Sequence, residues 1–431
     1  MQSNGLEIEW VRMSKKIRSF VVAGAAWLAV GHAWSQESLL SGYLDRLLAT
    51  HPAIRSKELA RQSTDQLVTS AWMQFLPTPS VSLDKGPASG GSSQATTYRI
   101  SQPIWTGGRL TAGLDAARLR HEQADLDIQE TAQSLSLKLI ALYQNWWALD
   151  AKLTIQKRDL ARLESLRDMM VRRVQSGVSA DIDLDLASVR VVQQQADVGQ
   201  TERMLASVRG QIRELFSEDL ALQSVALVDV PKIRMPYDTV LERVLDISPA
   251  LRKAQVAERL AQVEVDQVKA DAWPTLSVRA ERQDGSYLGA PNLAPGKNRL
   301  YATLQFNLGA GGSVVPQIKA ASARASSATE NIDATRRDVA AQIKSDWEDY
   351  HSVSERLPRL QRAAKSASTV VDSSLRLFTS GRRSWLDLIN AVREHSQSEL
   401  QLVDAQAALV GAGFKINLMA GQWGRQSSPS L

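Results

Sequence analysis

Apolar residues recur at heptad spacing along two long segments of the chain, a pattern that is typical of coiled-coil helices. The first segment covers residues 109–175 and would be about 100 Å long at 1.5 Å per residue. Its apolar positions include Leu139, Trp146, Leu153, Leu160 and Val174. The second segment has the corresponding positions Tyr350, Leu357, Ala364, Val371 and Phe378. No compact soluble domain of this size needs helices of such length.

Each long segment is followed by a second heptad series, and a similar turn precedes that series in both halves of the chain. The turn reads QSGVSADIDLDLA at residues 175–187 and TSGRRSWLDLINA at residues 379–391, so the two copies lie 204 residues apart. Gly177 and Gly381 can adopt the left-handed conformation that ends a helix. The candidate caps of the helices that follow are Ser179 or Asp181, and Ser384.

The two series in each half therefore predict an antiparallel helical hairpin, over residues 109–216 and again over residues 313–420. One residue conflicts with this pattern, because Pro358 lies inside the second long helix. Proline costs about 3 kcal/mol in a helix interior, since it lacks the N–H donor and its ring collides with the preceding turn. We therefore expect a kink at Pro358.

Shorter segments before the long helices alternate apolar and polar residues at period two, which predicts β-strands. The alternation is clearest at residues 300–308, and residues 275–283 form the partner strand. The first half repeats the arrangement, so that β-hairpins are predicted over residues 79–105 and 275–308. Strands of about ten residues have the length of a tilted membrane-spanning strand.

The whole arrangement is duplicated. HPAI at residues 51–54 corresponds to SPAL at 248–251, an offset of 197. After the next glycine cluster the offset is 204, so the second half carries seven extra residues in one loop. We expect two structural repeats, residues 36–216 and 246–420, each built from a helix, a β-hairpin and a long helical hairpin. Residues 217–245 would join the repeats, and residues 421–431 would form a flexible C-terminal tail.

The first 35 residues have the pattern of a signal peptide, with a basic start, an apolar run from Phe20 to Val30 and small residues before Gln36. The run is too short for a membrane-spanning helix. The chain has no cysteine, which excludes disulfides, zinc knuckles and a lipid-modified cysteine at the cleavage site. A net charge of +5 without a basic run makes nucleic acid an unexpected partner.

Large aromatic residues stand at one end of the predicted strands. Because the strands form hairpins, the residues that precede the first strand and follow the second lie at the same end. They are Trp72, Phe75, Trp105, Trp273 and Phe306. They predict an aromatic girdle at the interface with outer-membrane lipid, although packing against the neighbouring helices would also place them there.

No sequence motif indicates an enzyme or a cofactor site. The glycine pairs between strand and helix lack the lysine of a phosphate-binding loop and are expected to form turns; they are Gly107, Gly108, Gly311 and Gly312. The five histidines are not spaced as two ligands on one helix, so no metal site is expected. His395 occupies a coiled-coil position, where packing or a hydrogen bond is the expected role.

Four strands cannot close a barrel, because a bilayer tolerates no open sheet edge. The chain must therefore oligomerise, giving about eight strands as a dimer or about twelve as a trimer. Together these patterns predict an α+β membrane protein with one end in an outer membrane and long helices that cross the periplasm. A water-soluble coiled-coil scaffold is the alternative.

At this point the sequence resembles the TolC-type outer-membrane channels of drug efflux pumps and type I secretion systems. The resemblance covers nearly all of the chain after the signal peptide. It rests on the order and spacing of both tip turns and of the strand-to-helix junctions SQPIWTGGRL and LQFNLGAGGSV. It implies a homotrimer with a twelve-stranded barrel, a twelve-helix tunnel and an equatorial region near residues 217–245.

The resemblance also implies partners and a gate. The tips would dock to a periplasmic adaptor, and through it to an inner-membrane ABC transporter or proton-driven pump, using Gly177, Val178, Gly381 and Arg382. The periplasmic gate would be formed by Arg383, Asp387, Asp183 and Phe378. Phe378 replaces the usual tyrosine and Asn390 replaces a second carboxylate, so a closed state would depend more on Arg383. The alternative is that both aspartates only stabilise the starts of helices.

Two functions fit these patterns. The first is a passive exit duct of a tripartite export system, and the second is a periplasmic coiled-coil adaptor whose strands never enter a membrane. For an exit duct, the unlipidated N-terminus and the tip sequence GRRSWLDLINA favour type I protein secretion over multidrug efflux.

Overall fold

A computed structural model describes most of the chain after the predicted signal peptide. The described residues are 39–88, 91–223, 233, 235–286, 298–307 and 309–422. The signal peptide predicted over residues 1–35 lies outside them, as do most of the predicted C-terminal tail and part of the predicted linker.

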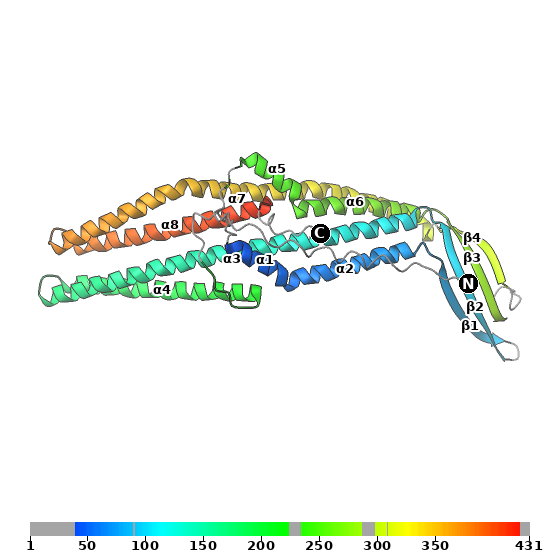
Figure 1. Ribbon diagram of the computed structural model, residues 1–431, viewed down its shortest axis with the longest axis horizontal. Helices are drawn as coiled ribbons and strands as arrows, with labels where there is room; N and C mark the ends of the chain where they lie inside the picture. The colour runs from blue at the N-terminus through cyan, green and yellow to red at the C-terminus, as the bar shows by residue number, and fades with distance from the viewer. Residues whose placement is uncertain are drawn as a thin grey trace, which may run out of the picture. The chain divides into compact units, whose positions relative to one another are not determined.

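The described chain is built from two halves that match element by element (Figure 1). The first half contains α1 (Leu39–Thr50), α2 (Pro52–Met73), β1 (Thr78–Ala88), β2 (Gly91–Trp105), α3 (Arg109–Gln175) and α4 (Asp181–Phe216). The second contains α5 (Tyr237–Ile247), α6 (Pro249–Ala270), β3 (Thr275–Ser286), β4 (Asn298–Gln305), α7 (Val314–Thr379) and α8 (Trp385–Met419). The long helices have 67 and 66 residues, and the return helices have 36 and 35. The expected fold of duplicated helical hairpins with four strands is confirmed.

Three details differ from the sequence-based expectations or add to them. β4 ends at Gln305, before the expected end of its strand, and Leu308 lies outside the described residues. A short 3₁₀ turn, η2 (Ala310–Gly312), precedes α7. Helix α7 continues through Pro358 without interruption, and the kink expected there stays a prediction. The missing N–H of Pro358 removes the hydrogen bond to the carbonyl of Ser354.

The four strands form one antiparallel sheet in the order β1-β2-β3-β4. The central pair, β2 and β3, joins the two halves, with Arg99 opposite Glu281 and Ile100 opposite Ala280. The register shifts between Pro103 and Trp105, where proline cannot donate to the ladder. β1 and β4 each have one edge that no described strand pairs.

The order of the helices follows the order of the strands, because every strand continues into a helix (Figure 1). Near the sheet, α2 contacts α3, α3 contacts α6, and α6 contacts α7. Farther from the sheet, α4 contacts α3, α3 contacts α8, and α8 contacts α7. Helix α3 therefore lies between two other helices along its whole length. Its neighbours are α2 and α6 near the sheet, and α4 and α8 farther from it.

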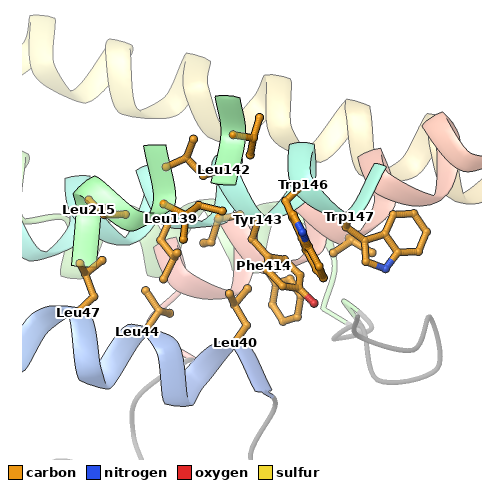
Figure 2. Packing of buried hydrophobic residues seen from close by; sticks show 14 of the residues in the cluster. Leu40, Leu44, Leu47, Leu139, Leu142, Tyr143, Trp146, Trp147, Leu215 and Phe414 are labelled. Carbon is orange, nitrogen blue, oxygen red and sulfur yellow. The ribbon is translucent and has the colours of Figure 1, made fainter. Parts of the chain in front are cut away.

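The largest apolar core surrounds the middle of α3 (Figure 2). Helix α1 presents three leucines at helical spacing toward α3, α4 and α8. The labelled members of this cluster are Leu40, Leu44, Leu47, Leu139, Leu142, Tyr143, Trp146, Trp147, Leu215 and Phe414. The hydroxyl of Tyr143 donates to the carbonyl of Gln223 at 2.7 Å, which fixes the chain that leaves α4. This core anchors the short helix α1 to both long hairpins.

Ion pairs join α3 to α2 and α6 around Asp127. Its carboxylate lies 3.1 Å from the Nζ of Lys57 on α2 and 2.6 Å from the Nζ of Lys253 on α6. Partial burial alone would raise the pKa of Asp127, but the hydrogen bonds from Lys253 and Lys57 outweigh it and hold the pKa below its ordinary value. Asp127 thus links three helices.

The turn between β2 and α3 fits closely against the turn between α6 and β3. Gly107 has a φ of +60°, and a Cβ added there would overlap the Cβ of Trp273 and lie 3.3 Å from the carbonyl oxygen of Ala270. In the second half, Gly311 has a φ of +62°, but the space around it is open. Of these two glycines, only Gly107 is needed both for its backbone conformation and for the space around it.

None of the described helices has a stretch that is both long enough and apolar enough to cross a bilayer.

We expect Gly107→Ala to destabilise the protein more than Gly311→Ala. Both substitutions place a side chain at positive φ, at a cost of about 1–2 kcal/mol, but only the first also forces a collision, which costs about 1–3 kcal/mol more. Thermal unfolding of the purified protein, followed by far-UV circular dichroism, should show the larger decrease in Tm for Gly107→Ala. Equal decreases would contradict the close contact with Trp273.

The pKa of Asp127 predicts how stability depends on pH. Because this pKa is lower in the folded protein, its stabilising contribution is fully present above the ordinary value of about 3.9 and is lost as the pH falls through the folded value. Between pH 6 and pH 3, Asp127→Asn should therefore lose less stability than the wild type. Asp115→Asn is the control, because Asp115 pairs with Arg118 on the exposed face of the same helix and links no second helix among the described residues. If the free energy of unfolding of Asp127→Asn falls with pH as steeply as that of the wild type, Asp127 does not link the helices.

Candidate functional site

The two hairpin tips carry most of the predicted functional residues, and their backbones are alike. After α3, the N–H of Gly177 donates to the carbonyl of Val174 and the N–H of Val178 to that of Arg173, both at 2.9 Å. After α7, Gly381 and Arg382 donate to Phe378 and Leu377 in the same way. This is the Schellman geometry that glycine permits, with φ of +70° and +73°. The repeated turn thus ends each long helix.

The starts of the return helices differ between the tips. Ser384 caps α8, and its hydroxyl accepts a hydrogen bond from the N–H of Asp387 at 3.1 Å. The corresponding cap of α4 is Ala180, which has no side chain to accept such a bond. Ser179 instead accepts from the Nε of Arg173 at 3.2 Å. Ser384 was therefore predicted correctly, whereas neither Ser179 nor Asp181 is the cap of α4.

An apolar cluster joins the two tips. It contains residues of α3, α4, α7 and α8, among them Leu166, Met170, Ala187, Phe378, Trp385 and Leu388. Phe378 is only 5% exposed, and its ring lies 5.5 Å from that of Trp385. The guanidinium of Arg173 lies 4.9 Å from the centre of the same ring, at cation–π distance. Phe378 therefore connects α7 to α3 without a phenolic hydroxyl.

The four predicted gate residues do not meet as one group. Arg383 donates from Nη1 to the hydroxyl of the fully buried Ser374, at 2.9 Å, within its own hairpin. Asp387 is exposed and Asp183 is half-buried, each in the first turn of its helix. No ion pair between Arg383 and either aspartate occurs within the described part of the chain. The first-turn positions also fit the helix-start role that the sequence left open.

Three tip residues with defined contacts were missed from the sequence: Arg173, Ser374 and Trp385. Trp385 offered a signal, since a large apolar residue directly after a capping serine is expected to face the core rather than solvent. Arg173 and Ser374 offered none, because their partners belong to another helix or to the other side of the turn. Only the packing of the helices assigns their roles.

The predicted docking residues lie on the outside of the turns. Gly177, Gly381 and Arg382 are exposed, and the side chain of Val178 is 61% exposed. A Cβ added at either glycine would meet nothing within 4 Å. A partner can therefore approach the backbone of both tips.

The predicted aromatic residues gather at the helix end of the sheet. Trp105 and Trp273 stack edge to face with ring centres 6.2 Å apart. The carbonyl of Phe75 accepts a hydrogen bond from Gln102 on β2 at 2.8 Å. Trp72, Trp105, Trp273 and Phe306 are largely exposed. Packing against neighbours thus accounts for part of this cluster, and exposed aromatic surface remains.

The turn glycines all have positive φ, but they differ in position. Gly108 is the cap residue that precedes α3, and Gly311 and Gly312 end the short η2 turn. Together with Gly107 they redirect the chain from strand to helix, as turns rather than as a phosphate-binding loop.

The two faces of the sheet differ in polarity. One face exposes apolar side chains, including Val81, Tyr98, Ile100, Leu300 and Leu304. The other carries a polar network in which Glu281 accepts a hydrogen bond from the hydroxyl of Tyr301 at 2.6 Å and pairs with Arg99 at 3.3 Å. Lipid suits the first face and water suits the second.

Sequence and structure comparisons identify relatives along almost the whole described chain. A family model described as "Outer membrane efflux protein" matches residues 43–216 and 240–422. Outer membrane protein TolC of Escherichia coli (strain K12) is 22% identical over 397 residues, which cover 86% of this chain and 79% of TolC. Nickel-cobalt-cadmium resistance protein NccC of Alcaligenes xylosoxydans xylosoxydans is 22% identical over 346 residues, which cover 76% of each chain.

A solved structure has the same fold. The crystal structure of the outer membrane protein VceC from Vibrio cholerae superimposes with a TM-score of 0.77 at 13% identity, covering 89% of this chain and 96% of VceC. The family match confirms the expected resemblance, favours a channel over a periplasmic adaptor, and agrees with the expectation that the chain is not an enzyme. The chain therefore belongs to the outer membrane efflux protein family, passive outer-membrane channels of Gram-negative bacteria that work in tripartite export systems.

Proposed function

We propose that this chain forms the homotrimeric exit duct of a type I protein secretion system. The observation that supports a duct is the open four-stranded sheet, which has one apolar face, one polar face and two edges that no described strand pairs, and which continues into helices of 67 and 66 residues. Such a sheet in a bilayer must pair both edges with further copies of itself. The polar face then lines the pore.

Three chains meet this requirement with twelve strands. A dimer would give eight strands, which is also a closed barrel in principle, but the resemblance to TolC-type channels favours three. The apolar face with Leu300 and Val81 would contact outer-membrane lipid, and the aromatic residues next to the helices would lie at the periplasmic interface. Water would fill the inside, next to Arg99 and Glu281.

The tips are the proposed docking site for a periplasmic adaptor. Gly177 and Gly381 leave the backbone of both turns accessible, and Val178 and Arg382 provide one apolar and one charged side chain beside them. The adaptor would connect the duct to an inner-membrane ABC transporter, the pump class of type I secretion. A proton-driven pump is the corresponding partner in multidrug efflux.

Arg383, Asp387, Asp183 and Phe378 are the proposed periplasmic gate. Within one chain Phe378 holds α7 against Arg173 of α3, and Arg383 is held by Ser374. In a trimer, three exposed Asp387 carboxylates would form a ring that attracts cations and repels its own members. The hydrogen bond from Arg383 to Ser374 would keep the guanidinium beside these carboxylates and so stabilise the closed state of the gate.

Two features of the sequence favour protein cargo. The chain contains no cysteine to which a lipid could be attached, and the tip reads GRRSWLDLINA. Both are closer to secretion channels than to lipidated drug-efflux channels. The function as a duct does not depend on this choice.

Deletion of the gene tests the proposed cargo. The mutant should fail to release a large polypeptide substrate of an ABC transporter while its susceptibility to antimicrobial compounds stays at the wild-type level. Re-expression should restore release, and the detergent-extracted protein should have the mass of three chains. Normal polypeptide release together with raised susceptibility would replace secretion by drug efflux. A monomer in the soluble periplasmic fraction would contradict the duct itself.

Removal of the Arg383 side chain should open the gate. In the closed trimer the guanidinium of Arg383 would offset the mutual repulsion of the three Asp387 carboxylates, so Arg383→Ser should raise the open fraction by about two- to fivefold, as expected for an exposed charge interaction. Conductance of the purified protein in planar bilayers measures this fraction. Arg382→Ser is the matched control, because it removes an exposed arginine from the same turn. Equal conductance of the wild type and Arg383→Ser would exclude Arg383 from the gate.

A further inference from the structure

Three side chains with metal-binding atoms come together between α3 and α8, away from the tips and the sheet. Asp159 belongs to α3, and His395 and Glu399 belong to α8. One ligand atom of each lies within 4.8 Å of the others. This is the one such group of three within the residues that the structure describes.

Two of the three residues, Asp159 and His395, are buried, and each has an atom without a hydrogen-bond partner, whereas Glu399 is half-buried. Asp159 is 2% exposed and its Oδ2 makes no hydrogen bond; His395 is 4% exposed and its Nδ1 makes none either. The Nδ1 of His395 lies 3.4 Å from a carboxylate oxygen of Glu399. A buried polar atom without a partner destabilises the folded chain. A shared cation would satisfy both atoms at once.

The ligand types and their positions suit a transition metal ion. His395 and Glu399 are four residues apart on one helix, a spacing that places both on the same face. Asp159 reaches the same point from the opposite helix. One imidazole and two carboxylates match the donors that bind Zn²⁺, which takes three protein ligands and a water in open sites.

A cavity beside the cluster provides room for that water and a path for the ion. It has a volume of about 250 Å³ and is bordered by Asp159 together with neutral polar side chains such as Gln156, Gln194 and Ser396. Arg190, Arg393 and Asp197 also border it. The two arginines outnumber the one aspartate and lower the expected affinity, so the binding should be tested in the micromolar range.

Arg158 forms ion pairs with both carboxylates of the cluster. It pairs with Glu399 and, at 3.3 Å, with the Oδ1 of Asp159. Its side chain is 48% exposed and can turn into solvent. It leaves the Oδ2 of Asp159 unused. The two carboxylates and Arg158 sum to −1, and Arg190, Arg393 and Asp197 around the cavity add +1, so the donor atoms rather than a net negative charge would hold the ion.

We propose that Asp159, His395 and Glu399 form a binding site for a divalent transition metal ion, with Zn²⁺ as its probe. The bound ion would join α3 to α8 and thus the first half of the chain to the second. This site does not depend on which cargo the duct exports. The sequence did not reveal it, because two of its ligands are carboxylates and one of them, Asp159, is 236 positions away from His395.

Titration of the purified, untagged protein with ZnCl₂ after removal of metal by a chelator tests the proposal. Isothermal titration calorimetry should give one Zn²⁺ per chain, and His395→Gln and Asp159→Asn should each weaken the binding by about tenfold or more. Zinc should also raise the Tm of the wild type, because it binds the folded chain.

His351→Gln is the matched control. His351 and Glu355 have the same four-residue spacing on α7 and lie 3.3 Å apart, but both are 60% exposed and have no third ligand. This variant should bind zinc as the wild type does. Failure of the wild type to bind zinc at millimolar concentration would overturn the proposal, as would unchanged binding by His395→Gln. If the site variants do not fold, the stoichiometry and the Tm shift of the wild type decide it alone.

Discussion

The pairing of β2 with β3 is the interaction on which the rest of the structure depends. Here the two halves form one sheet. Because each strand adjoins a helix in the sequence, the order of the strands determines the order of the helices. Once β2 and β3 are neighbours, α3 and α6 must be neighbours as well. Gly107 shows how tight this junction is, since no side chain fits between it and Trp273.

Helix α3 carries the consequences of that pairing along its whole length. Near the sheet it meets α2 and α6, and ion pairs at Asp127 hold the three helices together. In the middle it provides Leu139 and Tyr143 to the main core. Beyond the core its neighbours are α4 and α8, and polar groups again lie in the interface, where Asp159 faces His395. Apolar and ionic contacts thus alternate along one helix.

The tips show how one local structure serves two halves with different surroundings. Glycine ends both long helices by the same backbone hydrogen bonds. The side chains beside the turns differ, because Ser384 caps its helix whereas Ser179 accepts a hydrogen bond from Arg173. The contact of Arg173 with Phe378 then joins the tips.

The sequence by itself determined the elements, the duplication and the family resemblance. Heptad spacing, period-two alternation and glycine at helix ends are local signals, because they express the geometry of one helix, strand or turn. Only the tertiary structure decided the partners of Arg383, the cap of α4, and the meeting of Asp159 with His395 and Glu399. Those contacts join residues far apart in the chain, and their distances follow from helix packing, which no local pattern encodes.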